Sequence, residues 1–98
     1  MKFRIQYSRA ALAHLATLSK WQQVIVLNSV REQLEAEPTS QTRNRKPLRP
    51  NRLAGWELRI GNLRVYHDVD ETEVFVDVKA IGVKTRNDVF IAGEVFEL

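Results

Sequence analysis

Cysteine is absent from the 98-residue chain, which excludes disulfide bonds, thiolate nucleophiles and cysteine-based zinc or iron–sulfur sites. Glycine occurs four times, and none of the four falls in a loop pattern that cradles a nucleotide phosphate. No apolar run approaches the ~20 residues of a membrane-spanning helix, and the amino-terminal segment lacks the apolar core of a signal peptide. We therefore expect a cytoplasmic protein without a membrane partner, held together by side-chain packing.

The composition is that of a globular domain. Hydrophobic residues make up 44% of the chain and charged residues 28%, which argues against disorder. A chain of 98 residues has room for one hydrophobic core and is too short for two independent ones. We therefore predict a single domain over residues 1–98.

Positive charge is concentrated in the middle of the chain. Residues 43–64 contain seven basic residues and one acid, Glu57, so this stretch carries +6 and the rest carries −3 of the net +3. The seven are Arg43, Arg45, Lys46, Arg49, Arg52, Arg59 and Arg64. A block of one sign is typical of a surface that meets phosphates or an acidic partner, although a solvated basic loop has the same composition.

The first half of the chain shows one strand and two helices. Residues 3–7 alternate between apolar and polar, the pattern of a half-buried strand. Ser8 is a suitable N-cap for a helix over residues 9–18, and a second helical pattern runs from Trp21 until Pro38 stops it. The short link between the two helices requires either a helical hairpin or one kinked rod.

The second half is dominated by strands. Residues 38–55 have no sustained period and predict a loop, whereas residues 56–69 alternate about a Gly-Asn turn and predict a β-hairpin. Residues 74–81 are apolar at nearly every position and predict a central strand, and residues 89–91 predict a short final helix. The order β-α-α-β-β-β predicts an α+β fold, a small and mostly antiparallel sheet with an N-terminal helical hairpin on one face.

The turn of the predicted hairpin fixes its cross-strand pairs. Arg59 lies opposite Arg64, and Glu57 lies opposite Tyr66, all on the face that the helices leave uncovered. Two directly opposed arginines repel by about a few tenths of a kcal/mol unless an anion lies between them. This pair therefore indicates an anion-binding surface.

Such a surface suits the phosphodiester of RNA. Guanidinium groups bind phosphate oxygens in pairs and stabilise the charge that develops when a nucleophile attacks phosphorus. The candidate catalytic residues are Arg64, Arg59 and Lys84, because Lys84 follows the central strand and reaches the same rim. Tyr66 either stacks on an unpaired base or packs on its neighbours. The candidate RNA-binding residues are Arg45, Lys46, Arg49, Arg52, Tyr66 and Arg86.

Other catalytic groups are scarce. His14 and His67 lack partner motifs, so we expect structural roles, with His67 pointing to the helix-covered side. The acids between residues 68 and 73 lack metal-loop spacing and are expected to be solvated. No Ser-His-Asp arrangement is present. We predict no metal site and no cofactor.

The stretch 53–66, LAGWELRIGNLRVY, with residues 76–81 and the following GVKTRNDVF at 82–90, resembles the RelE/ParE superfamily of type II toxin–antitoxin toxins. The hairpin is the most diagnostic part, and the element order extends the likeness over essentially the whole chain. For the favoured RelE-like branch, the resemblance implies a translation-inhibiting mRNA interferase. Such an endoribonuclease binds mRNA on the ribosome and cleaves it without a metal, with the RNA 2′-hydroxyl as nucleophile.

The same resemblance places the family's hairpin arginine at Arg64 and one of its basic strand residues at Arg59. Three positions depart from the family: a second basic position is Glu57, an arginine is Lys84, and the acid–base tyrosine is Phe90. Loss of a proton-transfer group costs about 10²- to 10⁴-fold in rate, so we expect a weak nuclease. Tyr66 and Glu57 are the candidates to replace it.

Two other functions fit the same residues. A ParE-like toxin would inhibit DNA gyrase, and a catalytically degenerate protein would only bind its antitoxin. In each case an acidic antitoxin is expected, because a strongly basic surface attracts nucleic acid and an anionic, foldable segment covers it. We expect the antitoxin to wrap the sheet and the first helices and to displace or pin residues 87–98.

Overall fold

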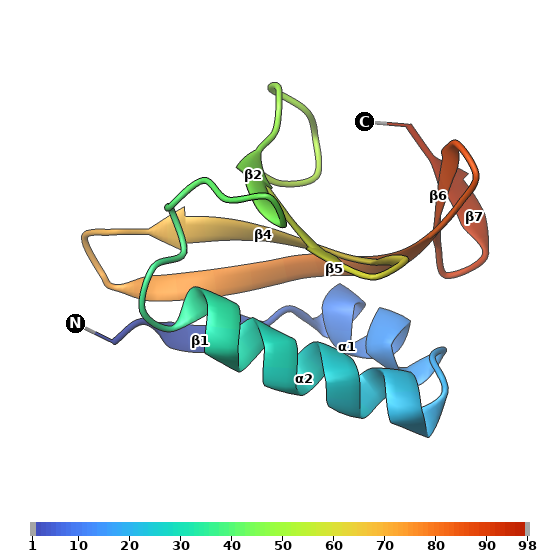
Figure 1. Ribbon diagram of the computed structural model, residues 1–98, viewed down its shortest axis with the longest axis horizontal. Coiled ribbons are helices and arrows are strands. Elements are labelled where there is room, and N and C mark those ends of the chain that lie inside the picture. Colours follow the sequence, from blue (N-terminus) through green and yellow to red (C-terminus); the bar gives the residue numbers. More distant parts are fainter. Residues whose placement is uncertain (1, 98) are drawn as a thin grey trace.

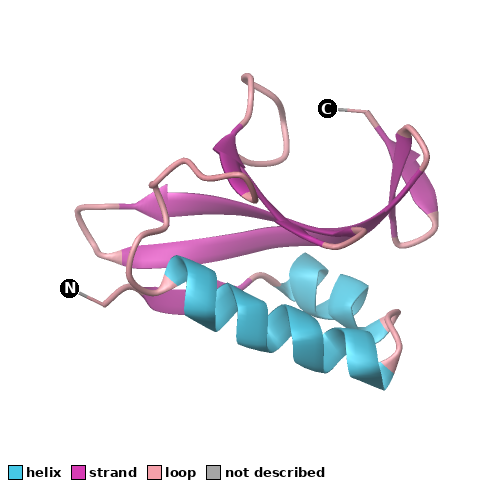
Figure 2. Cartoon of the chain, in the orientation of Figure 1, coloured by secondary structure: helices cyan, strands magenta, loops and turns pink. Residues whose placement is uncertain are grey.

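The computed structural model, which describes residues 2–97, contains two helices packed on one face of a curved, seven-stranded sheet (Figures 1 and 2). The elements are β1 (Arg4–Tyr7), α1 (Arg9–Ala16), α2 (Lys20–Leu34), β2 (Arg45–Pro47), β3 (Trp56–Ile60), β4 (Leu63–Asp70), β5 (Phe75–Thr85), β6 (Asp88–Ile91) and β7 (Glu94–Phe96). The predicted α+β class and the helical layer on one face are confirmed.

Both helices begin directly after a serine N-cap, Ser8 as predicted for α1 and Ser19 for α2. The Ser8 side chain accepts a hydrogen bond from the backbone of Ala11 at the start of α1. At the start of α2, Ser19 and Gln22 form a reciprocal capping box. With a cap on each side of the short link, α2 folds back along α1 as a hairpin (Figure 1).

The sheet is antiparallel except at one pair. Its order is β2-β3-β4-β5-β6-β7, and β1 pairs in parallel with the first part of β5. Beyond β1, the same edge of β5 pairs with β6, while β4 follows the opposite edge. Strand β5 is therefore central, as its nearly continuous apolar sequence predicts.

The β3–β4 hairpin has the predicted register. Arg59 pairs with Arg64 and Glu57 with Tyr66 across a two-residue turn. Gly61 opens that turn with φ at 59°, a conformation that glycine adopts without steric cost.

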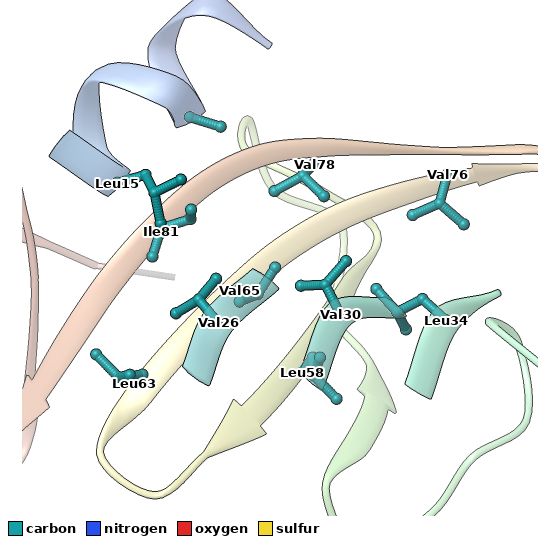
Figure 3. Close-up of a cluster of buried hydrophobic side chains, with 11 residues drawn as sticks. Leu15, Val26, Val30, Leu34, Leu58, Leu63, Val65, Val76, Val78 and Ile81 are labelled. Atoms are coloured by element: carbon teal, nitrogen blue, oxygen red, sulfur yellow. The ribbon is translucent and has the colours of Figure 1, made fainter. Parts of the chain in front are cut away.

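The main core lies between the helices and the sheet (Figure 3). It combines apolar side chains of α1 and α2 with those of the helix-facing positions of β3, β4 and β5. The buried members are Ala11, Leu15, Val26, Val30, Leu34, Leu58, Leu63, Val65, Val76, Val78 and Ile81. Their alternation along each strand leaves the other face of the sheet, here called the open face, to different side chains.

Two predictions on secondary structure are wrong. The predicted loop over residues 38–55 contains the short edge strand β2, and residues 89–91 belong to the β6–β7 hairpin instead of a helix. Ala92 and Gly93 take left-handed φ values of 52° and 83° and turn the chain back after β6. At Gly82, a Cβ would come within 2.9 Å of the Phe90 carbonyl oxygen, so the glycine allows β6 to lie close against β5.

Candidate functional site on the open face

The open face is bordered by the β2 region and by the β6–β7 hairpin, both of which rise away from the helices (Figures 1 and 2). It holds a second apolar cluster, composed of Ala54, Tyr66, Ala80 and Ile91. Tyr66 is completely buried in this cluster. The prediction that its ring is a surface for base stacking is therefore wrong, and the packing alternative is correct.

Burial also determines the acid–base character of Tyr66. Desolvation raises the pKa of its phenol well above the usual range, and the negative charge of Glu57 raises it further. The hydroxyl oxygen has no hydrogen-bond partner within residues 2–97. Tyr66 therefore stays protonated at neutral pH and cannot act as a general base there.

Glu57 neutralises Arg59. The Arg59 Nε atom donates to Glu57 Oε1 at 2.8 Å, and the two side chains are 36% and 8% exposed. Arg59 and Arg64 lie on one face as predicted, but an internal carboxylate relieves the charge at Arg59. The prediction that only an external anion offsets this repulsion is wrong, because Glu57, two residues away on the same strand face, pairs with Arg59.

Arg64 is held by its own hairpin. Its Nη1 donates to the carbonyl oxygens of Gly61 and Leu63 at 2.7 and 2.9 Å, and the residue is 8% exposed. These contacts fix a guanidinium beside the turn, on the same face as Arg59. A charge positioned in this way needs little reorganisation to stabilise an anion.

Lys84 and Glu57 border a common cavity of about 480 Å³ on the open face. The lining residues are Glu57, Lys84, Asn87, Asp88, Val89, Phe96 and Glu97. Three of these side chains are carboxylic acids and one is an amine. This cavity therefore combines charges of both signs, so the surface that was expected to bind anions also carries carboxylates.

The predicted RNA-binding role of Arg45 is also wrong. Its side chain is buried on the helix side, where Nε donates to the Ser40 carbonyl at 2.6 Å and Nη1 to the carbonyl of Gln33. The guanidinium thus satisfies a carbonyl in the last turn of α2. Arg45 pairs with Leu58 of β3, so the register turns it away from the open face.

The remaining basic residues of the 46–55 loop lie at the surface. Arg49 and Arg52 are exposed, and Lys46 is half-buried opposite Glu57. Asn51 organises the loop: its Oδ1 accepts from the backbone of Leu53 and Ala54, and its Nδ2 donates to the carbonyls of Arg49 and Ala54. The loop therefore presents two arginines from a defined backbone.

Arg86 and Phe90 lie at the β5–β6 end of the sheet. Arg86 is exposed in the tight turn between these strands, with a left-handed φ of 58°. Phe90 pairs with Val83, which packs against the main core, so Phe90 lies on the helix side of the sheet. The open-face neighbours in β6 are Val89 and Ile91, which cannot transfer protons either.

Both histidines lie on the helix side. His67 is fully buried and stacks on Trp56 with ring centroids 6.4 Å apart, which confirms its predicted direction. His14 Nδ1 accepts a hydrogen bond from the backbone of Ile81 at 3.2 Å. Within residues 2–97, the structure places no group of three or more His, Asp or Glu side chains where they could hold a metal ion.

One end of the open face is acidic, a feature that the sequence did not indicate. Asp68 pairs with Asp77 across β4 and β5, beyond an irregularity in register at Tyr66 and His67. Asp68 also accepts from the Gly55 backbone at 2.7 Å, and so connects β4 to the basic loop. The position of this bulge decides which residue of β4 lies opposite Asp77, and the sequence does not mark it.

The helix layer exposes apolar side chains. Trp21 is 72% exposed, and Leu12, Val24 and Leu27 are also solvent-accessible. Leu27 borders a groove with Ile5 and other residues of β1 and α2. None of the helices within residues 2–97 is both long and apolar enough to span a membrane.

Comparison with solved structures shows the same fold in toxin–antitoxin complexes. The chain superimposes on one from the RelBE2 complex of Mycobacterium tuberculosis with a TM-score of 0.75 and 20% identity, over 86% of this chain and 93% of the other. It matches a chain of the archaeal RelE–RelB complex of Pyrococcus horikoshii with a TM-score of 0.70 and 20% identity, over 88% and 99%. No family profile and no curated protein matches the sequence. The predicted RelE-like fold is confirmed.

Proposed function

We propose that this chain is the toxin of a type II toxin–antitoxin pair and that it cleaves mRNA on the ribosome in the cytoplasm. The observation that carries the proposal is the RelE-like fold, shared over most of both chains with TM-scores of 0.75 and 0.70. The candidate catalytic cations occupy the open face of that fold, away from the helix layer. A substrate can approach these residues there, because the helices do not cover this face.

The proposed reaction is attack of an RNA 2′-hydroxyl on the adjacent phosphorus. Arg64, fixed beside its turn, stabilises the negative charge on the phosphorus oxygens, and Arg59 supports it from the neighbouring strand. Lys84 holds a phosphate oxygen or the leaving group from the cavity wall. Arg86 contacts a flanking phosphate from its exposed turn.

The basic loop serves as the docking element for ribosomal RNA in this proposal. Arg49 and Arg52 are exposed, and the Asn51 hydrogen bonds hold the loop in one shape. Contacts of this kind supply affinity without sequence information and weaken as salt is added. Lys46, half-buried at the edge of the open face, joins the loop to the catalytic residues.

The proposed protein partner is an acidic antitoxin. The matched solved structures are of RelBE2 and RelE–RelB complexes, which suggests a RelB-like partner here. The helix layer offers a suitable surface, because Trp21 is exposed on α2 and Leu27 lines the groove beside β1. Arg31 lines that groove and favours an anionic segment.

A second candidate function is inhibition by binding alone, either of DNA gyrase or within a catalytically degenerate pair. The Glu57–Arg59 ion pair favours it, because it lowers the positive charge available to RNA. The buried, protonated Tyr66 favours it as well. Under this alternative the protein blocks growth and leaves messages intact.

Translation of a reporter message with purified protein separates the two functions. We expect cuts at defined codon positions that require ribosomes, and a loss of about 10²- to 10³-fold in cutting for Arg64→Ala. Arg9→Ala, a change of the same type on the helix side, should cut normally. Intact message together with inhibited gyrase supercoiling would instead establish the binding alternative, and circular dichroism checks that Arg64→Ala is folded.

A further inference from the structure

We propose that Glu57 is the general base of the cleavage reaction, an inference that rests on the proposed nuclease function. Glu57 stands where the family that the sequence resembles has a basic residue. Its side chain is only 8% exposed and lies beside the positive charges of the open face. A buried carboxylate in that place either only neutralises Arg59 or takes part in the reaction. The geometry around it favours the second role.

The contact with Arg59 occupies one of the two carboxylate oxygens. Arg59 Nε donates to Oε1, and the Tyr66 hydroxyl lies beside the same carboxylate. Glu57 also borders the open-face cavity, with Lys84 in the same wall. The carboxylate is thus oriented by one group and adjoins a space that is accessible to a ribose hydroxyl, which is the arrangement expected of a general base.

The other groups that transfer protons near neutral pH are placed elsewhere. His67 is stacked on Trp56 and fully buried on the helix side, and His14 accepts its hydrogen bond from the β5 backbone there. Tyr66 lies on the open face, but it is completely buried beneath Ala54 and Ile91. Neither histidine nor this tyrosine can reach a substrate in the cavity.

The cavity contains two further carboxylates, Asp88 and Glu97, which differ from Glu57 in exposure. Asp88 begins β6 and Glu97 follows β7, and both are exposed to solvent. Glu57 is held in β3 between β2 and β4, opposite Lys46 and Tyr66. Among these three acids, only Glu57 combines a fixed orientation with a position next to Arg59. Substitution of an exposed acid of the same cavity therefore serves as the control for substitution of Glu57.

The proposed step conserves atoms and charge. The Glu57 carboxylate takes the proton of the 2′-hydroxyl, and the resulting oxygen forms a bond to the adjacent phosphorus. The bond from phosphorus to the 5′-oxygen breaks, and the Lys84 ammonium protonates that oxygen. The products are a 2′,3′-cyclic phosphate and a 5′-hydroxyl, after which Glu57 loses its proton to solvent and Lys84 regains one.

Substitution of Glu57 by glutamine tests this role with little change in shape. Glu57→Gln keeps an acceptor for Arg59 and removes the base, so single-turnover cleavage of ribosome-bound mRNA should fall about 10²- to 10⁴-fold. Affinity for the programmed ribosome should stay within about threefold, because loss of a base leaves ground-state binding unchanged. Glu97→Gln, the same change in the same cavity, should cleave within about threefold of the parent.

Chemical rescue separates proton transfer from a structural effect. In Glu57→Ala, formate should restore part of the cleavage, because a small carboxylate can occupy the vacated space and accept the proton. If Glu57→Gln does not fold, Glu57→Asp takes its place, and its carboxylate should retain measurable cleavage that Glu57→Ala lacks.

Three outcomes would overturn the assignment: cleavage by Glu57→Gln at the parental rate, an equal loss in Glu97→Gln, or Glu57→Ala that does not respond to formate. If the parent protein itself leaves ribosome-bound mRNA uncut, the proposed nuclease function is the part that fails. That result is distinct, because the first three require an active parent enzyme.

Discussion

Arg59 and Glu57, two residues apart on β3, share a face of the sheet and are joined by a 2.8 Å contact between Arg59 Nε and Glu57 Oε1. A strand places alternate side chains on the same side, so the five-residue strand β3 is sufficient to bring these two side chains together. It brings a carboxylate to a surface that is otherwise suited to phosphate. Whether the acid mainly holds the arginine or accepts protons decides how the site works.

The stability role of this pair can be measured. Arg59→Met keeps the aliphatic stem and leaves the buried Glu57 carboxylate without its partner, so the free energy of unfolding should fall by about 1–3 kcal/mol. Adding Glu57→Gln should recover part of that loss, and urea denaturation of the four proteins gives the coupling. Lys2→Met, which breaks the exposed 3.7 Å contact with Glu35, should have little effect. If the changes in the free energy of unfolding for Arg59→Met and Glu57→Gln simply add, the ion pair does not contribute to stability and the prediction is wrong.

Arg45 is predicted to stabilise the fold without binding RNA. Its guanidinium donates to the carbonyls of Ser40 and Gln33, and Arg45→Met removes both hydrogen bonds. The free energy of unfolding should fall by about 2–3 kcal/mol in chemical denaturation. Arg43→Met, at an exposed position close by, should leave stability unchanged. A stable Arg45→Met protein with weakened RNA affinity would show that Arg45 faces the RNA after all.

His67 should make the fold sensitive to acid. Burial lowers the pKa of His67 from 6.5 to about 4, so between these values the unfolded chain binds more protons than the folded one. The contribution of His67 is therefore complete above pH 6.5 and is lost as the pH falls toward 4, by about 3 kcal/mol in all. His67→Phe should flatten this part of the pH profile of unfolding. A parallel profile in that variant would contradict the prediction.

Gly82 should keep Tyr66 buried, because it allows β6, which contributes Ile91 to the cluster around Tyr66, to lie close to β5. In Gly82→Ala the new Cβ meets the Phe90 carbonyl oxygen at 2.9 Å, so β6 has to move away from β5. Tyr66 then becomes hydrated, and its phenol should ionise at a lower pH than in the parent, as followed by the ultraviolet absorbance of tyrosinate. Gly55→Ala, where a Cβ meets only the flexible Asp68 side chain at 3.3 Å, is the matched control. Unchanged titration in Gly82→Ala would contradict the predicted movement.

Local signals made much of the fold predictable. The Ser8 cap, the helical spacing before Pro38 and the Gly-Asn turn act over a few residues, and the structure has the helices and the hairpin register that they specify. The direction of His67 followed from the same alternation. The final hairpin was wrongly predicted as a helix because it depends on the close approach of β6 to β5 at Gly82, a contact between residues on different strands.

The candidate site was less predictable, because burial there is a long-range property. Tyr66 lies on the predicted face of the sheet. The residues that bury it there, Ala54 and Ile91, come from the loop before β3 and from β6, which are distant in sequence. Arg45 belongs to the short edge strand β2, for which the sequence shows no alternating pattern. The face of the sheet to which its side chain points could therefore not be predicted. The Glu57–Arg59 contact, by contrast, was readable from the spacing of two opposite charges on one strand face.

Strand β5 joins the two ends of the described chain into one mechanical unit. Its residues from Phe75 to Val78 pair with β1, and those from Val83 to Thr85 pair with β6 along the same edge. A force that peels off the first strand or the last hairpin therefore acts on a shared backbone, and loosening at one end is transmitted to the other. Backbone amides in the middle of β5 should accordingly be among the last to exchange with deuterium, with the protection of both ends rising and falling together.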